Sequence, residues 1–156
     1  MLSRGGAACL LVLAFMCASP AADAQSTRRG IEVEEAWIRP PTRQTPEPYA
    51  FFTIINNTDR DERLVSVVTR GGTATLARLH LGLKTFVERV EYIDVPAYRS
   101  LKLKPGGDFV MLRDSGKDLM PGYTLTLTLR FQNAGSRDIE VPITNQLLGN
   151  MGRPKP

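Results

Sequence analysis

Short segments in which every second residue is hydrophobic run along most of this chain. In the clearest, Tyr123 to Phe131, leucines alternate with threonines, which is the period of a strand with one buried face and one wet face. Shorter runs of the same kind predict strands at Ile31–Ile38, Tyr49–Asn56, Leu64–Thr69, Thr75–Leu81, Phe86–Ile93, Ser100–Leu103, Phe109–Leu112 and Ile139–Ile143. No repeat and no sustained helical period occurs. So many short strands predict an all-β sandwich or barrel.

The breaks between these runs carry turn residues. Pro40-Pro41 lacks amide donors, and Gly71-Gly72 and Gly106-Gly107 tolerate unusual backbone angles. Asn56-Asn57-Thr58-Asp59 is typical of a tight connection. Its first three residues also fit the acceptor pattern for N-glycosylation, but so short a pattern often matches by chance, and we favour the turn.

The first 24 residues have the pattern of a cleaved signal peptide. A short charged head precedes an apolar run of about a dozen residues, which is too short to span a membrane, and Ala22-Asp23-Ala24 is typical of a cleavage site. An alternative is lipidation of Cys17, although the bulky residues before it disfavour this. We therefore predict a signal peptide at 1–24, an arm at 25–30, a single domain at 31–143 and a loose tail at 144–156.

Composition narrows the chemistry of the exported chain. Both cysteines, Cys9 and Cys17, lie in the predicted signal peptide, so we expect no disulfide, thiolate metal site or cysteine nucleophile afterwards. The net charge is only +4, and basic residues are scattered among acidic ones, which argues against nucleic-acid binding. Once the signal is cleaved, no segment predicts stable insertion into a membrane.

Few side chains could carry a reaction or bind a metal. One histidine, His80, and three methionines, Met111, Met120 and Met151, remain after cleavage. The nucleophile, metalloprotease and phosphate-binding motifs are absent, and a chance pairing of carboxylates is a weak alternative, so we expect no enzyme. The strand period turns His80 away from the core, whereas Met111 could equally be an ordinary core residue.

Several segments in this order resemble the landmarks of the PCu(A)C family of periplasmic copper chaperones. They are Ile31–Arg39 (IEVEEAWIR), Tyr49–Asn56, Arg63–Val65, Leu79-His80, Val95–Ala97, Leu103–Gly107 and Leu125–Phe131. The resemblance implies a cupredoxin-like Greek-key β-sandwich that holds Cu(I) through two histidines and two methionines. It also implies copper delivery to a respiratory copper centre in the periplasm, with a cytochrome oxidase subunit or assembly factor as partner.

Compared position by position, the resemblance predicts an incomplete set of copper ligands. His80 stands at the first histidine, and Met111 at the methionine of the family's His-x-Met pair. Phe109 replaces the second histidine, and no methionine lies between His80 and Met111 to supply the other thioether. Cu(I) prefers imidazole and thioether donors. At roughly 3 kcal/mol per ligand, two lost ligands cost on the order of four to six decades in affinity.

Three hypotheses follow. In the first, His80 and Met111 bind Cu(I) weakly, and either a partner protein or Met120 completes the coordination shell. This hypothesis requires the side chains of His80 and Met111 to converge at the surface. In the second, the domain is a metal-free interaction module that assists assembly of an exported or membrane complex and docks through an apolar patch of Phe109, Val87 and Met111. In the third, Asp108 and a nearby carboxylate beside His80 select Cu(II) or Zn(II).

Overall fold

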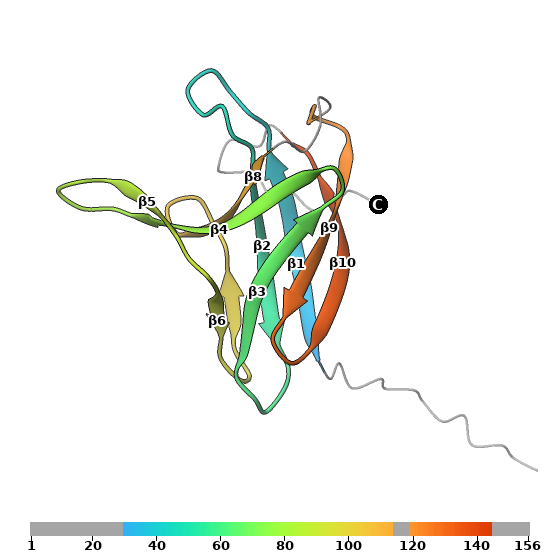
Figure 1. Ribbon diagram of the computed structural model, residues 1–156. Helices are drawn as coiled ribbons and strands as arrows, with labels where there is room; N and C mark the ends of the chain where they lie inside the picture. Colours follow the sequence, from blue (N-terminus) through green and yellow to red (C-terminus); the bar gives the residue numbers. More distant parts are fainter. Residues whose placement is uncertain (1–29, 114–118, 145–156) are drawn as a thin grey trace, which may run out of the picture.

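The structure, a computed structural model, describes residues 30–113 and 119–144, and these residues form strands and connections without any helix. The strands are β1 (Ile31–Arg39), β2 (Tyr49–Asn56), β3 (Glu62–Thr69), β4 (Gly72–His80), β5 (Phe86–Arg89), β6 (Ile93–Val95), β7 (Ser100–Lys102), β8 (Asp108–Arg113), β9 (Thr124–Phe131) and β10 (Gly135–Pro142) (Figure 1). The all-β prediction is confirmed.

Two predicted strands differ most from the observed ones. The expected strand Phe86–Ile93 is two strands, because β5 pairs with β4 whereas β6 pairs with β3, and the chain passes from one partner to the other around Val90–Tyr92. The last strand begins at Gly135 rather than Ile139, since β10 pairs with β9 along its whole length. Its first residues are exposed, so the hydrophobic pattern does not reveal them.

The strands form an almost closed antiparallel sheet. Their order is β1-β2-β8-β4-β3-β9-β10, and β5, β6 and β7 attach at β4, β3 and β2. The two ends of this order meet through a parallel bridge between Ile38 and Ile143. The β4–β5 hairpin projects from the body to one side (Figure 1).

The interior is filled by one hydrophobic cluster, most of whose members are aliphatic. Its fully buried members come from most of the strands and include Ile38, Phe52, Ile54, Leu64, Val110, Leu112, Leu127, Leu129 and Val141. Asn56 is also fully buried, and its side chain bonds the carbonyls of Arg60 and Val95 and accepts from Thr58. The turn interpretation of this segment is therefore correct, and the Asn56 amide is not accessible for glycosylation.

A bulge in β1 reverses which residues face the interior. The β1–β2 register shifts between Glu34 and Trp37, and Glu35 has a φ of 52°, a left-handed conformation that its ion pair with Lys102 at 2.7 Å helps to hold. Before the bulge Ile31 packs in the interior, and after it Ile38 does. Trp37 and Arg39 are consequently turned to the outer face of the sheet.

The outer face of β2, β4 and β8 carries a second apolar cluster. Phe51, Ala77, Phe109 and Met111 are buried there, with Trp37, Tyr49 and Leu79 packed against them. We call this set of seven the outer cluster. The β8 strand is therefore buried on both faces, since Val110 and Leu112 belong to the interior.

The predicted signal peptide at 1–24, the arm up to residue 29 and the tail from residue 145 lie outside the described residues. Within the described part of the chain, no helix is long and apolar enough to cross a membrane.

Candidate functional site

His80 lies at the end of β4, on the projecting hairpin. Its Nε2 atom lies 2.7 Å from Oε2 of Glu88 on β5, and its ring stacks on Phe86 with centroids 4.7 Å apart. The imidazole is 39% exposed, and the carboxylate of Glu88 is 51% exposed. Because His80 pairs with Phe86 and Arg78 with Glu88, all four side chains share one face of the hairpin. On β4 this face is the one that carries the interior residue Leu76, but His80 lies beyond the body of the sheet and is therefore partly exposed.

Met111 lies in a different environment. It pairs with Tyr49 on β2 and with Thr75 on β4, it is 6% exposed, and it belongs to the outer cluster. Phe109, two residues earlier on the same face, is 4% exposed, and its ring lies 4.8 Å from that of Tyr49. Both side chains are therefore almost completely shielded from solvent.

The structure does not bring His80 and Met111 together. Met111 lies opposite Thr75, five positions along β4 from His80, which is about 16 Å in an extended strand. Odd and even positions of β4 also face opposite sides, so His80 and the partner of Met111 point to different faces. One ion therefore does not contact both His80 and Met111 of a single copy. The expected convergence of these two side chains is wrong, because the register of β4 with β8 keeps them apart.

The third hypothesis placed Asp108 beside His80, and the structure assigns Asp108 another partner. Arg78 donates to both carboxylate oxygens of Asp108 at 2.6 and 3.1 Å, and this pairing raises the pKa of Arg78 above its usual value. The carboxylate beside His80 is that of Glu88. Among the described residues, no group of three or more His, Cys, Asp or Glu side chains could hold a metal ion.

An apolar pocket opens on the outer face beside the hairpin. Its volume is about 240 Å³, and its walls include Tyr49, Phe51, Leu79, Val87 and Phe109. Of the patch predicted from Phe109, Val87 and Met111, only Val87 is exposed, at 47%. Phe109 forms the buried floor of the pocket. The single charged side chain in its lining is Arg39, whose guanidinium lies 4.7 Å from the centre of the Tyr49 ring.

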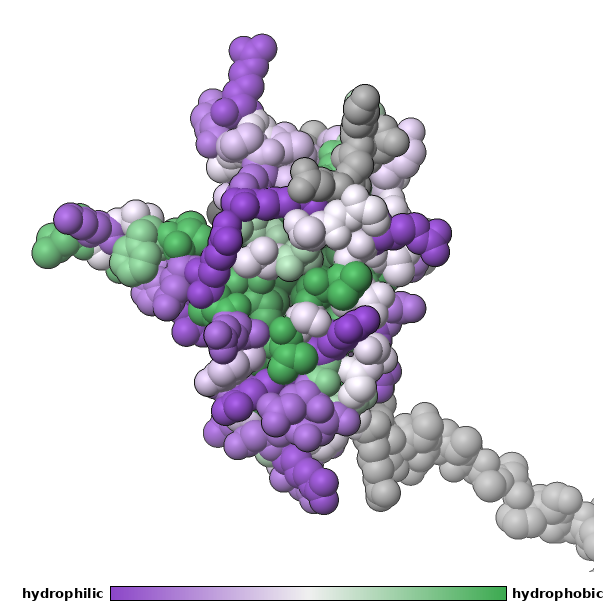
Figure 2. All heavy atoms as spheres, in the orientation of Figure 1, coloured by the Kyte–Doolittle hydropathy of each residue, from purple (hydrophilic) through white to green (hydrophobic). Residues whose placement is uncertain are grey.

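Large apolar side chains are exposed along the hairpin itself. Leu81 is 68% exposed, Phe86 is 54% exposed, and Leu83, in the turn, is fully open to solvent. Figure 2 shows hydrophobic residues on this projection and on the body beside it. The four residues of β5 are all exposed, and within the described chain β5 has β4 as its pairing partner on one side only.

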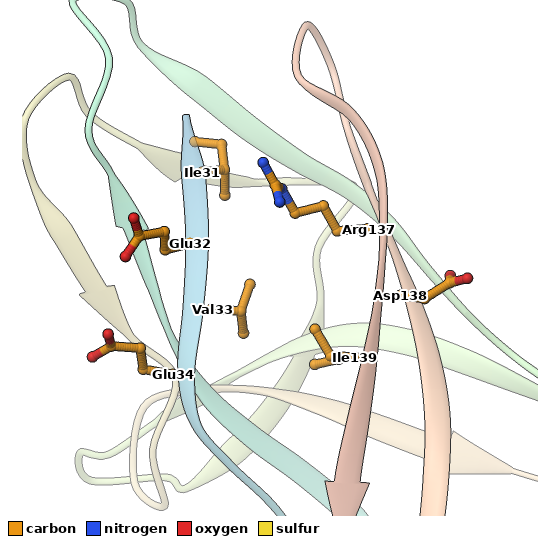
Figure 3. A pocket seen from close by; sticks show the side chains of 7 residues that line it. All are labelled: Ile31, Glu32, Val33, Glu34, Arg137, Asp138 and Ile139. Atoms are coloured by element: carbon orange, nitrogen blue, oxygen red, sulfur yellow. The ribbon is translucent and has the colours of Figure 1, made fainter. Parts of the chain in front are cut away.

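Another hollow, of about 380 Å³, lies along the seam between β1 and β10 (Figure 3). Val33 and Ile139 face each other across it, Arg137 points toward Ile31, and Glu32 and Glu34 point to the other side of β1. This seam separates the ends of the sheet, and its lining offers neither imidazole nor thioether.

Sequence reasoning missed several residues of this region. Trp37 and Arg39 reach the outer face because of the β1 bulge, and the signal for it was the pair Glu34-Glu35, which interrupts the alternation of the strand. The sequence pattern did not single out Glu88. Its contact with His80 depends on the register of the β4–β5 hairpin, which period-two reasoning does not supply.

The fold and this surface define a cupredoxin-like β-domain with an apolar outer face and a projecting hairpin. The model of the family "Putative lipoprotein LpqE-like" matches residues 31–143, and the chain belongs to this family. A curated relative, "Putative lipoprotein Lxx21020" of Leifsonia xyli subsp. xyli, is 28% identical over 119 residues, which are 73% of this chain and 69% of that protein.

Solved structures of PCuAC domains are similar to this chain. The copper-bound PCuAC domain from PmoF2 has a TM-score of 0.62 at 25% identity and covers 74% of this chain and 93% of its own. The apo PCuAC domain from PmoF1 has a TM-score of 0.62 at 27% identity, and the match covers 74% of this chain and 94% of that one. Apo-DR1885 from Deinococcus radiodurans shares the fold, with a TM-score of 0.55 at 20% identity. The match covers 94% of this chain and 100% of that one. The relation to PCuAC domains and the predicted fold class are confirmed.

Proposed function

We propose that this protein is an exported, copper-chaperone-like binding domain, with copper as cargo and no catalytic activity. The match to a family named for lipoproteins and the likeness to PCuAC domains, one of them copper-bound, support this role. The apolar run at the amino terminus supports export to the periplasm. A cytochrome oxidase subunit or assembly factor is the recipient that we propose.

One observation carries the proposal, the pair of His80 and Glu88 on the projecting hairpin. An imidazole and a carboxylate lie 2.7 Å apart and are both partly exposed. The imidazole suits either oxidation state of copper, the carboxylate suits Cu(II) better than Cu(I), and the remaining positions are left to a partner. Such a half-built site holds copper weakly in one protein and more firmly between two. Met111 does not share this shell, because it lies on the other face of β4, and so the residue that we propose for metal contact is His80.

The test is a metal titration of the exported protein, read at the ring signals of its single histidine by NMR. We expect Cu(I) to shift the His80 signals and paramagnetic Cu(II) to broaden them, with an affinity at least about four decades below that of a four-ligand site. The His80→Ala variant should lose this binding, and Glu88→Gln should weaken it. Exposed Glu140→Gln serves as the matched control on another strand. Ring signals that neither move nor broaden at any metal concentration would contradict the proposal.

The alternative is a metal-free interaction module, and the exposed side chains of the hairpin favour it. Leu83 is the best probe, because it is fully exposed and makes no contribution to the interior. The substitution Phe109→Asp, by contrast, would place a charge in the outer cluster and disturb the fold. We expect Leu83→Asp to leave the unfolding temperature unchanged and to weaken capture of a partner at least tenfold, irrespective of chelators.

The two roles are separated by comparing these variants in one assay. A solution capture from the exported and membrane fractions is measured for the unaltered protein, Leu83→Asp, His80→Ala and the neighbouring control Lys84→Gln. The interaction module predicts that only Leu83→Asp loses the partner. The copper role predicts that His80→Ala or a chelator removes it as well. Capture that none of the variants changes would rule out the hairpin as the contact surface.

A further inference from the structure

Arg39 differs from the other arginines whose partners are known in this structure. Arg63, Arg78 and Arg113 form ion pairs with Asp94, Asp108 and Glu47, respectively. Arg39 has no carboxylate partner among the described residues, and its Nε atom is buried without a hydrogen bond. A buried donor without an acceptor is costly, and such a group in a native fold calls for an explanation, of which a bound acceptor is one.

The same arginine is the one charged group in the lining of the outer-face pocket. Its guanidinium is held over the ring of Tyr49. This contact orients the planar group of N–H donors but gives them no hydrogen-bond acceptor. Apart from Thr45, the rest of the wall is mostly apolar, with Phe51 and Phe109 nearly buried as its floor. A cation at the edge of an aromatic pocket selects a molecule that has an apolar body and an anionic end.

We propose that this pocket binds a small carboxylate with an apolar body. The carboxylate accepts hydrogen bonds from Arg39, whose fork matches its two oxygens, and the body lies against Phe51, Leu79 and Phe109. At about 30 Å³ per water-sized group, the pocket volume of about 240 Å³ holds a whole ligand, carboxylate included, of roughly eight non-hydrogen atoms. The ligand is a free short-chain acid or the carboxyl end of a peptide, which share this chemistry. The site involves no metal ligand, so it stands apart from the copper role.

The single tryptophan of the chain is a built-in reporter for this site. Trp37 packs on Phe51, with ring centroids 4.6 Å apart, and Phe51 lines the pocket. Titrations of its fluorescence in the metal-free exported protein use hexanoate, hexan-1-ol and hexylammonium, which share a six-carbon skeleton and carry different head groups. We expect hexanoate to bind with a Kd of about 1 mM, at least tenfold more tightly than the alcohol, and hexylammonium to bind least. Equal affinities, or no saturable change with hexanoate, would overturn the proposal.

Variants locate the selectivity. Arg39→Gln should lower the affinity for hexanoate at least tenfold and leave that for hexan-1-ol within twofold, whereas the exposed Arg89→Gln should change neither. An unchanged preference in Arg39→Gln would also overturn the proposal. The head-group series on the unaltered protein decides the matter even if Arg39→Gln does not fold.

N-acetyl-glycyl-leucine and its amide show whether the carboxylate comes from a peptide end or from a free acid. Tighter binding of the peptide acid than of hexanoate identifies a peptide end, and the reverse identifies a free acid.

Discussion

Combining Phe109→His with Val87→Met should strengthen Cu(I) binding by at least two orders of magnitude. The positions are suitable because Phe109 and Met111 are two residues apart on the outer face of β8, and Val87 lines the same pocket as Phe109. The variant would therefore offer an imidazole and two thioethers on one face, the donors that Cu(I) prefers. Two added ligands at roughly 3 kcal/mol each would raise the affinity for Cu(I) by about four decades. The burial of the site reduces this gain.

The measurement is competition with a cuprous chelator, and the control is Phe109→Leu with Val87→Leu, which changes the same positions without adding donors. Loss of the Phe109 ring contacts should cost about 1–3 kcal/mol of unfolding free energy in both variants, so stability is measured alongside. An affinity for Cu(I) no greater than that of the control would show that the outer face of β8 does not have the geometry of the copper site in PCuAC domains.

Replacing Glu62 with glutamine should lower the free energy of unfolding by about 2–3 kcal/mol at pH 7. Glu62 begins β3 and is 5% exposed, and its carboxylate accepts from the backbone amides of Arg63, Asn133 and Ala134 at 2.7 to 3.2 Å. It therefore ties the start of β3 to the turn between β9 and β10. A glutamine amide keeps one acceptor oxygen but loses the charge that strengthens these bonds.

The same carboxylate predicts a dependence of stability on acid. Burial by itself raises the pKa of Glu62, but the hydrogen bonds from the three amides and the Asn133 side chain outweigh it and hold the pKa below its ordinary value of 4.5. Because the folded pKa is the lower one, the contribution is complete above about pH 4.5 and is lost as the pH falls through the folded value. Glu62→Gln should flatten this fall.

Denaturant unfolding at pH 7 and at a series of pH values from 5 to 3 checks both effects, with Glu140→Gln as the control. Glu140 is exposed and accepts one hydrogen bond, from the Thr126 hydroxyl, so its replacement should cost no more than about 0.5 kcal/mol. A Glu62→Gln protein as stable as the control, with an unchanged acid profile, would refute the role assigned to this carboxylate.

The sequence predicted the strands best where one face is buried and the other is wet. Residues of β9 alternate between leucine and threonine, and the strand was found within one residue of its bounds. On β8 the strand itself was also found within one residue of each bound, but because both of its faces are apolar, its alternation did not show that Phe109 and Met111 are buried on the outer face. The start of β10 was missed, because its residues are exposed and polar on both faces and show no alternation.

The amino-acid sequence by itself determined the fold class, the small number of metal-binding side chains and the relation to PCuAC domains. Those properties depend on local periodicity, composition and ordered landmarks, which need no coordinates. Only the tertiary structure decided which side chains meet. The register of β4 with β8 separates His80 from Met111, and the hairpin register joins His80 to Glu88. The β1 bulge turns Arg39 into the apolar pocket, since one extra residue exchanges the two faces of a strand.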